Sequence, residues 1–105
     1  MFTKIEDGKI LAKLNDLRLW PKNPRIAEDK DLERLKKQIK ELGVYKPLLV
    51  TPDGEILGGN MRFKMLKELV KEDPIKYEFV WVSVVDAWTD SERLKYALSD
   101  NAQLS

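Results

Sequence analysis

The residues of this chain best suited to chemistry begin with paired glycines, Gly58 and Gly59, followed by Asn60, Met61 and Arg62. An apolar run ends directly before them and an amphipathic pattern follows, so they stand where a strand gives way to a helix. The first amides of a helix have no partners within the helix and lie at the positive end of its dipole, so they attract phosphate. Glycine lets an anion approach the backbone closely. The segment therefore predicts an anion-binding helix start.

The side chains of this segment allow two interpretations. Arg62, in the first turn, could add a forked pair of hydrogen bonds to the same anion, and Asn60 could cap the helix or touch the ligand. The simpler interpretation is a turn that needs a positive φ, followed by an ordinary surface arginine. The pattern by itself leaves both open.

Two other segments carry polar residues of the same kind. Asn23-Pro24-Arg25 lies in a loop whose prolines forbid a helix, and Arg25 is a candidate contact for phosphate or for a partner subunit. Asp100, Asn101 and Gln103 lie at the end of the chain's last predicted helix. Each segment also has a simpler interpretation, as a rigid loop or as a plain helix end.

The elements that must position these residues follow from periodicity and turn signals. Residues 9–14 predict a first strand, and a helix is predicted from Asp29 to the stop at Gly43. The apolar runs at 47–51 and 55–57, joined by a Pro-Asp-Gly turn, predict a hairpin that leads into the Gly58–Gly59 segment.

The second half of the chain predicts a helix, a strand and another helix. A one-sided apolar pattern predicts a helix from Met61 to the Asp73-Pro74 stop. Residues 77–85 are apolar at nearly every position, which predicts a strand covered on both faces with Trp81 in the core. Thr89-Asp90-Ser91-Glu92 fits a capping box and predicts a last helix that runs to about Asn101.

The order and spacing of these elements, with three sequence boxes, resemble the ParB N-terminal and sulfiredoxin superfamily over roughly residues 9–103. The boxes read Pro-x-Asn-Pro-Arg, Gly-Gly-x-x-Arg and Asp-Asn-x-Gln in this chain. The resemblance implies an α+β domain with a small mixed β-sheet packed with about three helices. It places the ligand groove between the helix start at 59–62 and the Pro24-Arg25 loop.

In ParB proteins the corresponding Gly-Glu-Arg-Arg box binds nucleotide triphosphate. Here Asn60 replaces the Glu and Met61 the second basic residue, while Leu104 replaces the arginine that ends the third box, so the resemblance supports anion binding more than turnover. The implied ligand is a nucleotide (CTP, ATP or ADP) with Mg²⁺. The implied contacts are Gly58, Gly59, Asn60, Met61, Arg62 and Arg25, with Asn23, Asp100, Asn101 and Gln103 as secondary contacts.

Composition excludes several classes of function. The chain has 105 residues, no cysteine and no histidine, so thiol chemistry, sulfiredoxin activity, the usual zinc sites and histidine-based triads are ruled out. Nineteen basic and eighteen acidic residues leave a net charge of +1, which predicts only weak DNA binding by the chain itself. The sequence shows neither a signal peptide nor a membrane span, so we expect a cytoplasmic protein.

The function expected from these observations is nucleotide binding with little or no catalysis, in a DNA-associated protein of partition, transcription regulation or phage and mobile-element DNA modification. Residues 1–105 would form a single domain, a fragment or N-terminal domain of a longer protein that reads DNA through another module and could form a homodimer. One alternative is an enzyme, an ADP-dependent kinase or ParB-like nuclease, using carboxylates such as Asp53, Glu55 or Asp100. The other alternative is a purely structural or dimerisation module.

Overall fold

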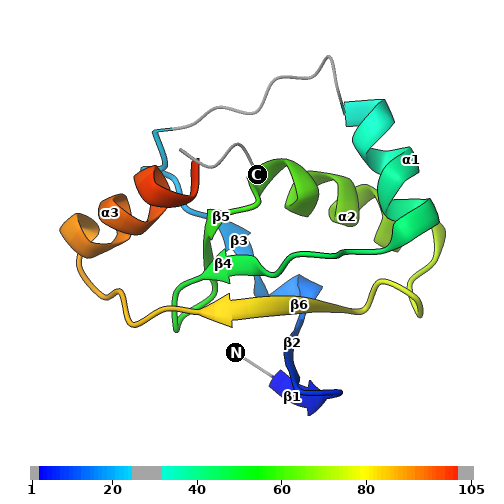
Figure 1. The fold of residues 1–105 in the computed structure, drawn as a ribbon, viewed down its shortest axis with the longest axis horizontal. Coiled ribbons are helices and arrows are strands. Elements are labelled where there is room, and N and C mark those ends of the chain that lie inside the picture. The colour runs from blue at the N-terminus through cyan, green and yellow to red at the C-terminus, as the bar shows by residue number, and fades with distance from the viewer. Residues whose placement is uncertain (1–2, 25–31, 102–105) are drawn as a thin grey trace.

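The structure of the chain is a computed structural model that describes residues 3–24 and 32–101, without the side chains of residues 100 and 101. Within these ranges it consists of one six-stranded sheet and three α-helices (Figure 1). The strands are β1 (Thr3–Glu6), β2 (Lys9–Lys13), β3 (Arg18–Leu19), β4 (Leu48–Val50), β5 (Glu55–Gly58) and β6 (Phe79–Val84). The helices are α1 (Leu32–Leu42), α2 (Asn60–Glu72) and α3 (Asp90–Asn101), and a 3-10 turn, η1 (Leu14–Asp16), follows β2.

The sheet is mixed and runs in the order β1-β2-β6-β4-β5-β3. β6 pairs antiparallel with β2 and parallel with β4. β5 pairs antiparallel with β4 and parallel with the short strand β3. The predicted α+β fold with a small mixed sheet and about three helices is thereby confirmed, and β5 is the strand that delivers the chain to the start of α2.

Helices cover both faces of the sheet at β5. Ile56 and Leu57 are both fully buried, and because consecutive strand residues point to opposite faces they enter two different clusters. The main core lies under α1 and α2 and contains Ala12, Leu14, Leu17, Ile39, Leu48, Val50, Ile56, Phe63, Met65, Leu66, Leu69, Tyr77, Val80 and Val82. The small core lies under α3 and contains Trp20, Leu57, Ala87 and Ala97.

Most of the predicted elements are present close to their expected bounds. The hairpin is confirmed as β4 and β5, and the first predicted strand as β2. The helix predicted from Asp29 is present as α1 from Leu32, with residues 29–31 outside the described part of the chain. β1 was not predicted, because all four of its residues are exposed and the strand has no apolar face to recognise.

The prediction that residues 77–85 form a strand covered on both faces is wrong. β6 buries Val80 and Val82, but Phe79 and Trp81 on its other face are only half-buried. α3 packs against β5, and lysine side chains lie over the β6 rings instead: Lys9 is 4.7 Å from the centre of the Trp81 ring. Trp81 is therefore not a core residue, and its aromatic ring forms a cation–π contact with Lys9 at the surface.

Candidate functional site

The turn between β5 and α2 needs glycine for two reasons. Gly59 is the N-cap of α2 with φ 85° and ψ 30°, in the left-handed region, which confirms the predicted need for a positive φ. A β-carbon on Gly59 would lie 2.6 Å from Cδ2 of Leu48 in β4. Gly58 closes β5 and is buried. Gly59 therefore brings the backbone close to β4 at the point where the helix begins.

α2 begins without a side-chain cap. The amide of Phe63 donates to the carbonyl of Gly59 at 2.9 Å, which is the first turn of the helix, and no acidic residue lies in that turn. Asn60 is the first helical residue rather than the N-cap, so the prediction that it could cap the helix is wrong. Its Oδ1 is buried and accepts no hydrogen bond in the described structure. The positive end of the helix dipole thus meets no carboxylate from its own first turn.

Arg62 lies at this turn but points inward. It is only 7% exposed, so the interpretation as an ordinary surface arginine is wrong. Its Nη1 donates to the carbonyl of Lys46 at 3.4 Å, and its Nη2 would lie 3.2 Å from a β-carbon on Gly59. The guanidinium therefore packs across Gly59 and brings a fixed positive charge to the helix start.

The proline-rich loop is held beside the end of β5. The amide of Asn23 donates to the carbonyl of Trp20 at 3.1 Å, and its Nδ2 donates to the carbonyl of Leu57 at 3.3 Å. Trp20 is buried in the small core. Asn23 thus joins the loop to β5 one residue before Gly58, and the groove expected beside this loop stays a prediction. Arg25, the other candidate in this loop, lies outside the described residues.

α3 brings the third sequence box toward the same strand. α3 contacts β5, and Ala97 packs with Leu57 in the small core. The helix continues to Asn101, so the backbone of Asp100 and Asn101 forms its end. Figure 1 shows this end of α3 on the same side as the junction between β5 and α2. The side chains of Asp100 and Asn101, and the whole of Gln103, lie outside the described part of the chain.

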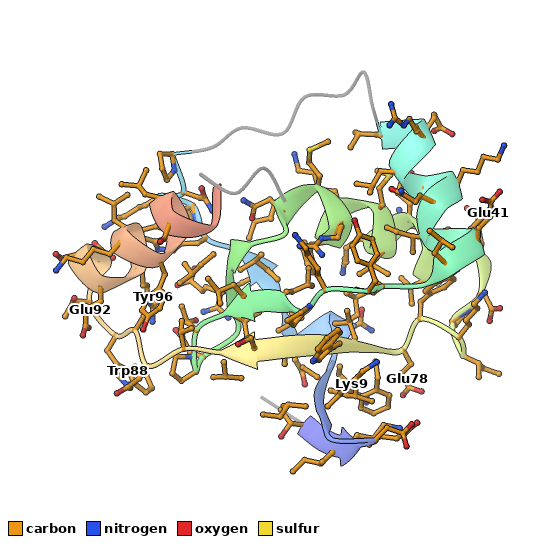
Figure 2. All side chains as sticks on the ribbon, in the orientation of Figure 1. Lys9, Glu41, Glu78, Trp88, Glu92 and Tyr96 are labelled. Carbon is orange, nitrogen blue, oxygen red and sulfur yellow. The ribbon has the colours of Figure 1, made fainter. Side chains whose placement is uncertain are left out.

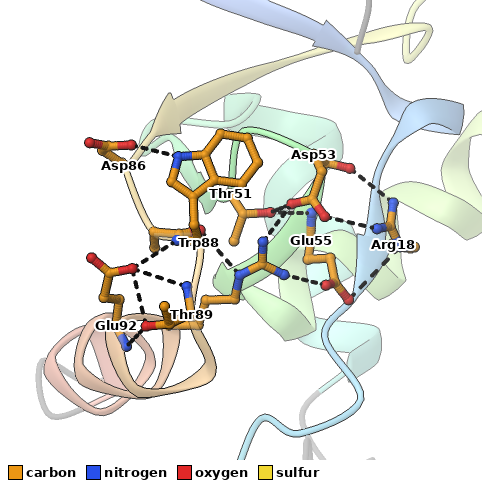
Figure 3. A network of polar contacts seen from close by, with 10 residues as sticks. Arg18, Thr51, Asp53, Glu55, Asp86, Trp88, Thr89 and Glu92 are labelled. Carbon is orange, nitrogen blue, oxygen red and sulfur yellow. Dashed lines mark hydrogen bonds and ion pairs between the residues drawn. The ribbon is translucent and has the colours of Figure 1, made fainter.

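A network of charged side chains, which the sequence did not predict, surrounds the opposite end of β5 (Figure 3). Its centre is Arg93 of α3, whose Nε donates to the carbonyl of Ala87 at 3.1 Å. Nη1 donates to Glu55 at 2.5 Å and Nη2 to Asp53 at 2.9 Å. Arg18 of β3 approaches the same two carboxylates from the other side, at 3.4 Å from Asp53 and 3.8 Å from Glu55.

The Asp53 carboxylate of this network is held in the charged form. The Thr51 hydroxyl donates to Asp53 at 2.5 Å and lowers the pKa of that carboxyl, with smaller contributions from the Arg93 and Arg18 charges. Glu55 has a side chain only 12% exposed and contacts both arginines. Asp53 and Glu55 are two of the three carboxylates that the sequence offered to an enzyme of this superfamily, and the side chain of the third, Asp100, lies outside the described part of the chain. Their engagement with arginine makes them ties between elements rather than a free general base.

The outer side of α3 faces solvent. Figure 2 shows Glu92 and Tyr96 on α3 and Trp88 in the segment before the helix, and all three are exposed. Glu92 accepts from the amides of Trp88 and Thr89, and the Thr89 hydroxyl accepts from the amide of Glu92, so the predicted capping box is confirmed.

The described residues contain no group of three or more His, Cys, Asp or Glu side chains that could hold a metal ion. None of the helices in that part of the chain has the length and apolar character of a membrane span.

Known proteins are similar to this chain in sequence and in fold, although no family model matches it. The chain is 33% identical over 109 residues to the chromosome-partitioning protein Spo0J of Thermus thermophilus, and the match covers 98% of the chain but 37% of Spo0J. A C-terminally truncated ParB of Caulobacter crescentus, solved in complex with CTP-γ-S, superposes with a TM-score of 0.71 and 26% identity, over 89% of this chain and 52% of that one.

Two further solved structures agree in fold. A Pnob8-like ParB-N domain superposes with a TM-score of 0.65 at 18% identity, over 82% of this chain and 32% of that one. The C. crescentus ParB complexed to the centromeric parS site superposes with a TM-score of 0.62 at 23% identity, over 89% of this chain and 46% of that one. The chain is a ParB-like N-terminal domain, as its three boxes implied. It spans little more than a third of the curated relative it matches.

Proposed function

We propose that this domain binds the phosphates of a nucleoside triphosphate, CTP above the others, at the start of α2 in a chromosome- or plasmid-partition protein. The observation that carries the proposal is the uncapped helix start behind Gly59, which has no acidic residue in its first turn. The similar ParB of C. crescentus was solved with CTP-γ-S, which supports a nucleotide as the anion. The T. thermophilus relative supports partition as the process.

The residues of the turn fit a phosphate group. The amides at the start of α2 supply hydrogen-bond donors and the positive end of the dipole. Gly58 and Gly59 leave the backbone uncovered by side chains of their own, and the buried Arg62 guanidinium adds a fixed positive charge. The Asn60 Oδ1, buried without a donor, fits a ligand group that brings one, such as a hydroxyl or amino group. Mg²⁺ would accompany the phosphates.

Arg62 is a poor choice for testing this proposal, because truncating a buried guanidinium is expected to lower stability as well as affinity. Asn60→Asp is sharper. It keeps the size of the side chain and adds a negative charge at the first helical residue, where a carboxylate suits the helix dipole but repels phosphate. The matched control is Ser91→Asp, which adds the same charge to the first turn of α3 at an exposed position.

The experiment is a calorimetric titration of the 105-residue chain with CTP, ATP, ADP and GTP in the presence of Mg²⁺. We expect CTP to bind, Asn60→Asp to weaken it at least about tenfold and Ser91→Asp to change it less than about twofold. All three proteins should unfold at similar temperatures. The proposal fails if the unchanged chain binds none of the four nucleotides, or if Asn60→Asp binds CTP as tightly as the unchanged chain.

We further propose that DNA is contacted through a module outside these 105 residues and that nucleotide binding favours contact between two copies of the domain. The net charge of +1 supports the first part, because an isolated domain with so little excess positive charge gains little from phosphate contacts. The similar ParB of C. crescentus was solved on the parS site, which supports the link to DNA. Sedimentation with and without CTP tests the second part: the chain should shift from monomer to dimer when CTP is present.

A further inference from the structure

α3 and β5 run side by side in matched steps. Arg93 of α3 meets Glu55 at the start of β5, and one helical turn later Ala97 packs with Leu57. Four residues of helix advance about 6 Å, and two residues of strand advance nearly the same distance, about 6.6 Å. The next step of this progression pairs position 101 of the helix with position 59 of the chain. The backbone register therefore carries the end of α3 to the turn that starts α2.

Arg93 is the residue that fixes this register. It is 6% exposed, and three of its nitrogens donate to three different acceptors: the carbonyl of Ala87, the carboxylate of Glu55 and the carboxylate of Asp53. A planar guanidinium satisfies such a set in one orientation only. A slide of α3 by one residue along β5 would break the bonds to Glu55 and Asp53 and leave a buried charge without its carboxylates, which is costly.

The acceptors are themselves held in place. Arg18 contacts both carboxylates from β3, and the Thr51 hydroxyl bonds Asp53 while accepting the amide of Glu55 at 2.9 Å. Among the described residues, the small core has four buried side chains, two of them alanines, with Leu49 and Val85 partly buried against it. α3 contributes only Ala97 to these six, and so small a side chain packs without preferring one axial position of the helix. Polar geometry rather than apolar packing therefore sets where α3 sits.

We propose that Arg93 is a positioning residue for the nucleotide site: by fixing α3 against the β4–β5 turn, it holds the Asp100-Asn101 end of the helix beside the Gly58–Gly59 turn. This inference rests on the proposed function and adds a residue that none of the three sequence boxes contains. It also implies that affinity for nucleotide depends on contacts at the far end of β5 from the ligand.

The test uses Arg93→Met, which keeps the apolar stem and removes the three bonds, and Arg93→Lys, which keeps the charge without the fork. The control is Ile39→Val, a buried change in α1 on the other face of the sheet that lowers stability without touching α3. For each variant of the 105-residue chain, CTP affinity is measured with Mg²⁺ at a temperature where the protein is folded. Amide hydrogen exchange is measured without nucleotide.

We expect Arg93→Met to weaken CTP binding at least tenfold and to speed exchange of the α3 amides at least tenfold relative to those of α2. Arg93→Lys should restore part of both, and Ile39→Val should leave affinity within twofold. Unchanged CTP affinity in Arg93→Met, or an equal loss in Ile39→Val, overturns the inference. If the unchanged chain binds no nucleotide, the proposed function falls, and unchanged α3 exchange in Arg93→Met then overturns the positioning of α3 as well.

Discussion

The two ends of β5 treat polar groups in opposite ways. At the end of β5 next to the β4–β5 turn, here called the turn end, arginines bind the carboxylates of Asp53 and Glu55. The Nε, Nη1 and Nη2 atoms of Arg93 all have acceptors there. At the α2 end, the helix starts without a side-chain cap, and Asn60 buries an oxygen that accepts nothing in the described structure. Only four residues of strand separate these two environments.

This difference separates a structural cluster from the proposed ligand site. Buried polar atoms in folded proteins nearly always have partners, so a complete set of partners needs no ligand, whereas a buried acceptor without one needs an explanation. A charged cluster read alone would have drawn attention to Arg93 and Glu55. Their hydrogen bonds indicate that these residues hold elements together, whereas the buried acceptor without a donor, Asn60 Oδ1, lies at the other end of the strand.

The largest effects are expected from the glycines that flank β5. Gly54 and Gly59 both have positive φ. A β-carbon on Gly54 would lie 2.6 Å from the carbonyl oxygen of Asp16, and a β-carbon on Gly59 would lie 2.6 Å from Cδ2 of Leu48. A side-chain methyl can move aside more easily than a backbone carbonyl. Gly54→Ala should therefore cost about 4 kcal/mol of unfolding free energy and Gly59→Ala about 3 kcal/mol, measured by urea denaturation.

Gly8→Ala separates backbone strain from crowding in this comparison. Gly8 has φ 76° and nothing within 4 Å of a β-carbon, so this variant should lose only about 1 kcal/mol. A loss in Gly8→Ala equal to that in Gly59→Ala would show that close approach at the α2 turn contributes nothing, and the packing of Leu48 against the turn would lose its significance.

A smaller effect is expected from the ion pairs at the turn end. Glu55→Gln removes one charge that faces Arg93, whose side chain is only 8% exposed, and leaves Asp53 as its remaining carboxylate. We expect a loss of about 2 kcal/mol. Lys22→Gln breaks the pair between Lys22 and Asp90, whose side chains are 66% and 61% exposed. This control should lose less than about 0.5 kcal/mol, and equal losses in the two variants would contradict a structural role for the network.

The fold was largely predictable because its signals are local. The Pro-Asp-Gly turn between β4 and β5, the one-sided apolar pattern of α2 and the capping box at Thr89 each act within a few residues of sequence. β1 and the open face of β6 were missed or misjudged for a shared reason. Their environment depends on which strands and helices lie beside them, and an apolar residue such as Trp81 reads the same whether a helix or a lysine covers it.

The candidate site was predictable in part. The glycine pair marks its own turn, because only glycine tolerates both the φ and the space at Gly59. The inward direction of Arg62 was not predictable, since it depends on the carbonyl of Lys46, sixteen residues away. Asp53 and Glu55 were noted as carboxylates, but their pairing with Arg93 was missed, because Arg93 lies 40 and 38 residues away from them and belongs to no motif. Pairings of this kind appear only once the chain is folded.

The smallest expected effect is a dependence of stability on pH, which tests whether Asp53 at the turn end of β5 is held by its hydrogen-bond partners. The Thr51 hydroxyl, more than the nearby arginines, lowers the pKa of Asp53 below its ordinary value of 3.8. A carboxyl whose pKa is lower in the folded state contributes stability that is complete above the unfolded pKa and is lost as the pH falls through the folded pKa. Asp53 should therefore stabilise the domain above about pH 4 and stop doing so in more acidic solution, as acid denaturation would show.

Thr51 supplies the controls for this pH dependence. NMR titration of the Asp53 carboxyl should give a pKa below 3.8 in the unchanged chain and in Thr51→Ser, which keeps the hydroxyl. In Thr51→Val the pKa should move back toward that value, because the first cause of the shift is gone and the arginine charges remain. A pKa of Asp53 at or above 3.8 in the unchanged chain would mean that this carboxylate is not held by its neighbours. The contrast between the two ends of β5 would then fail at one of the two carboxylates that face Arg93.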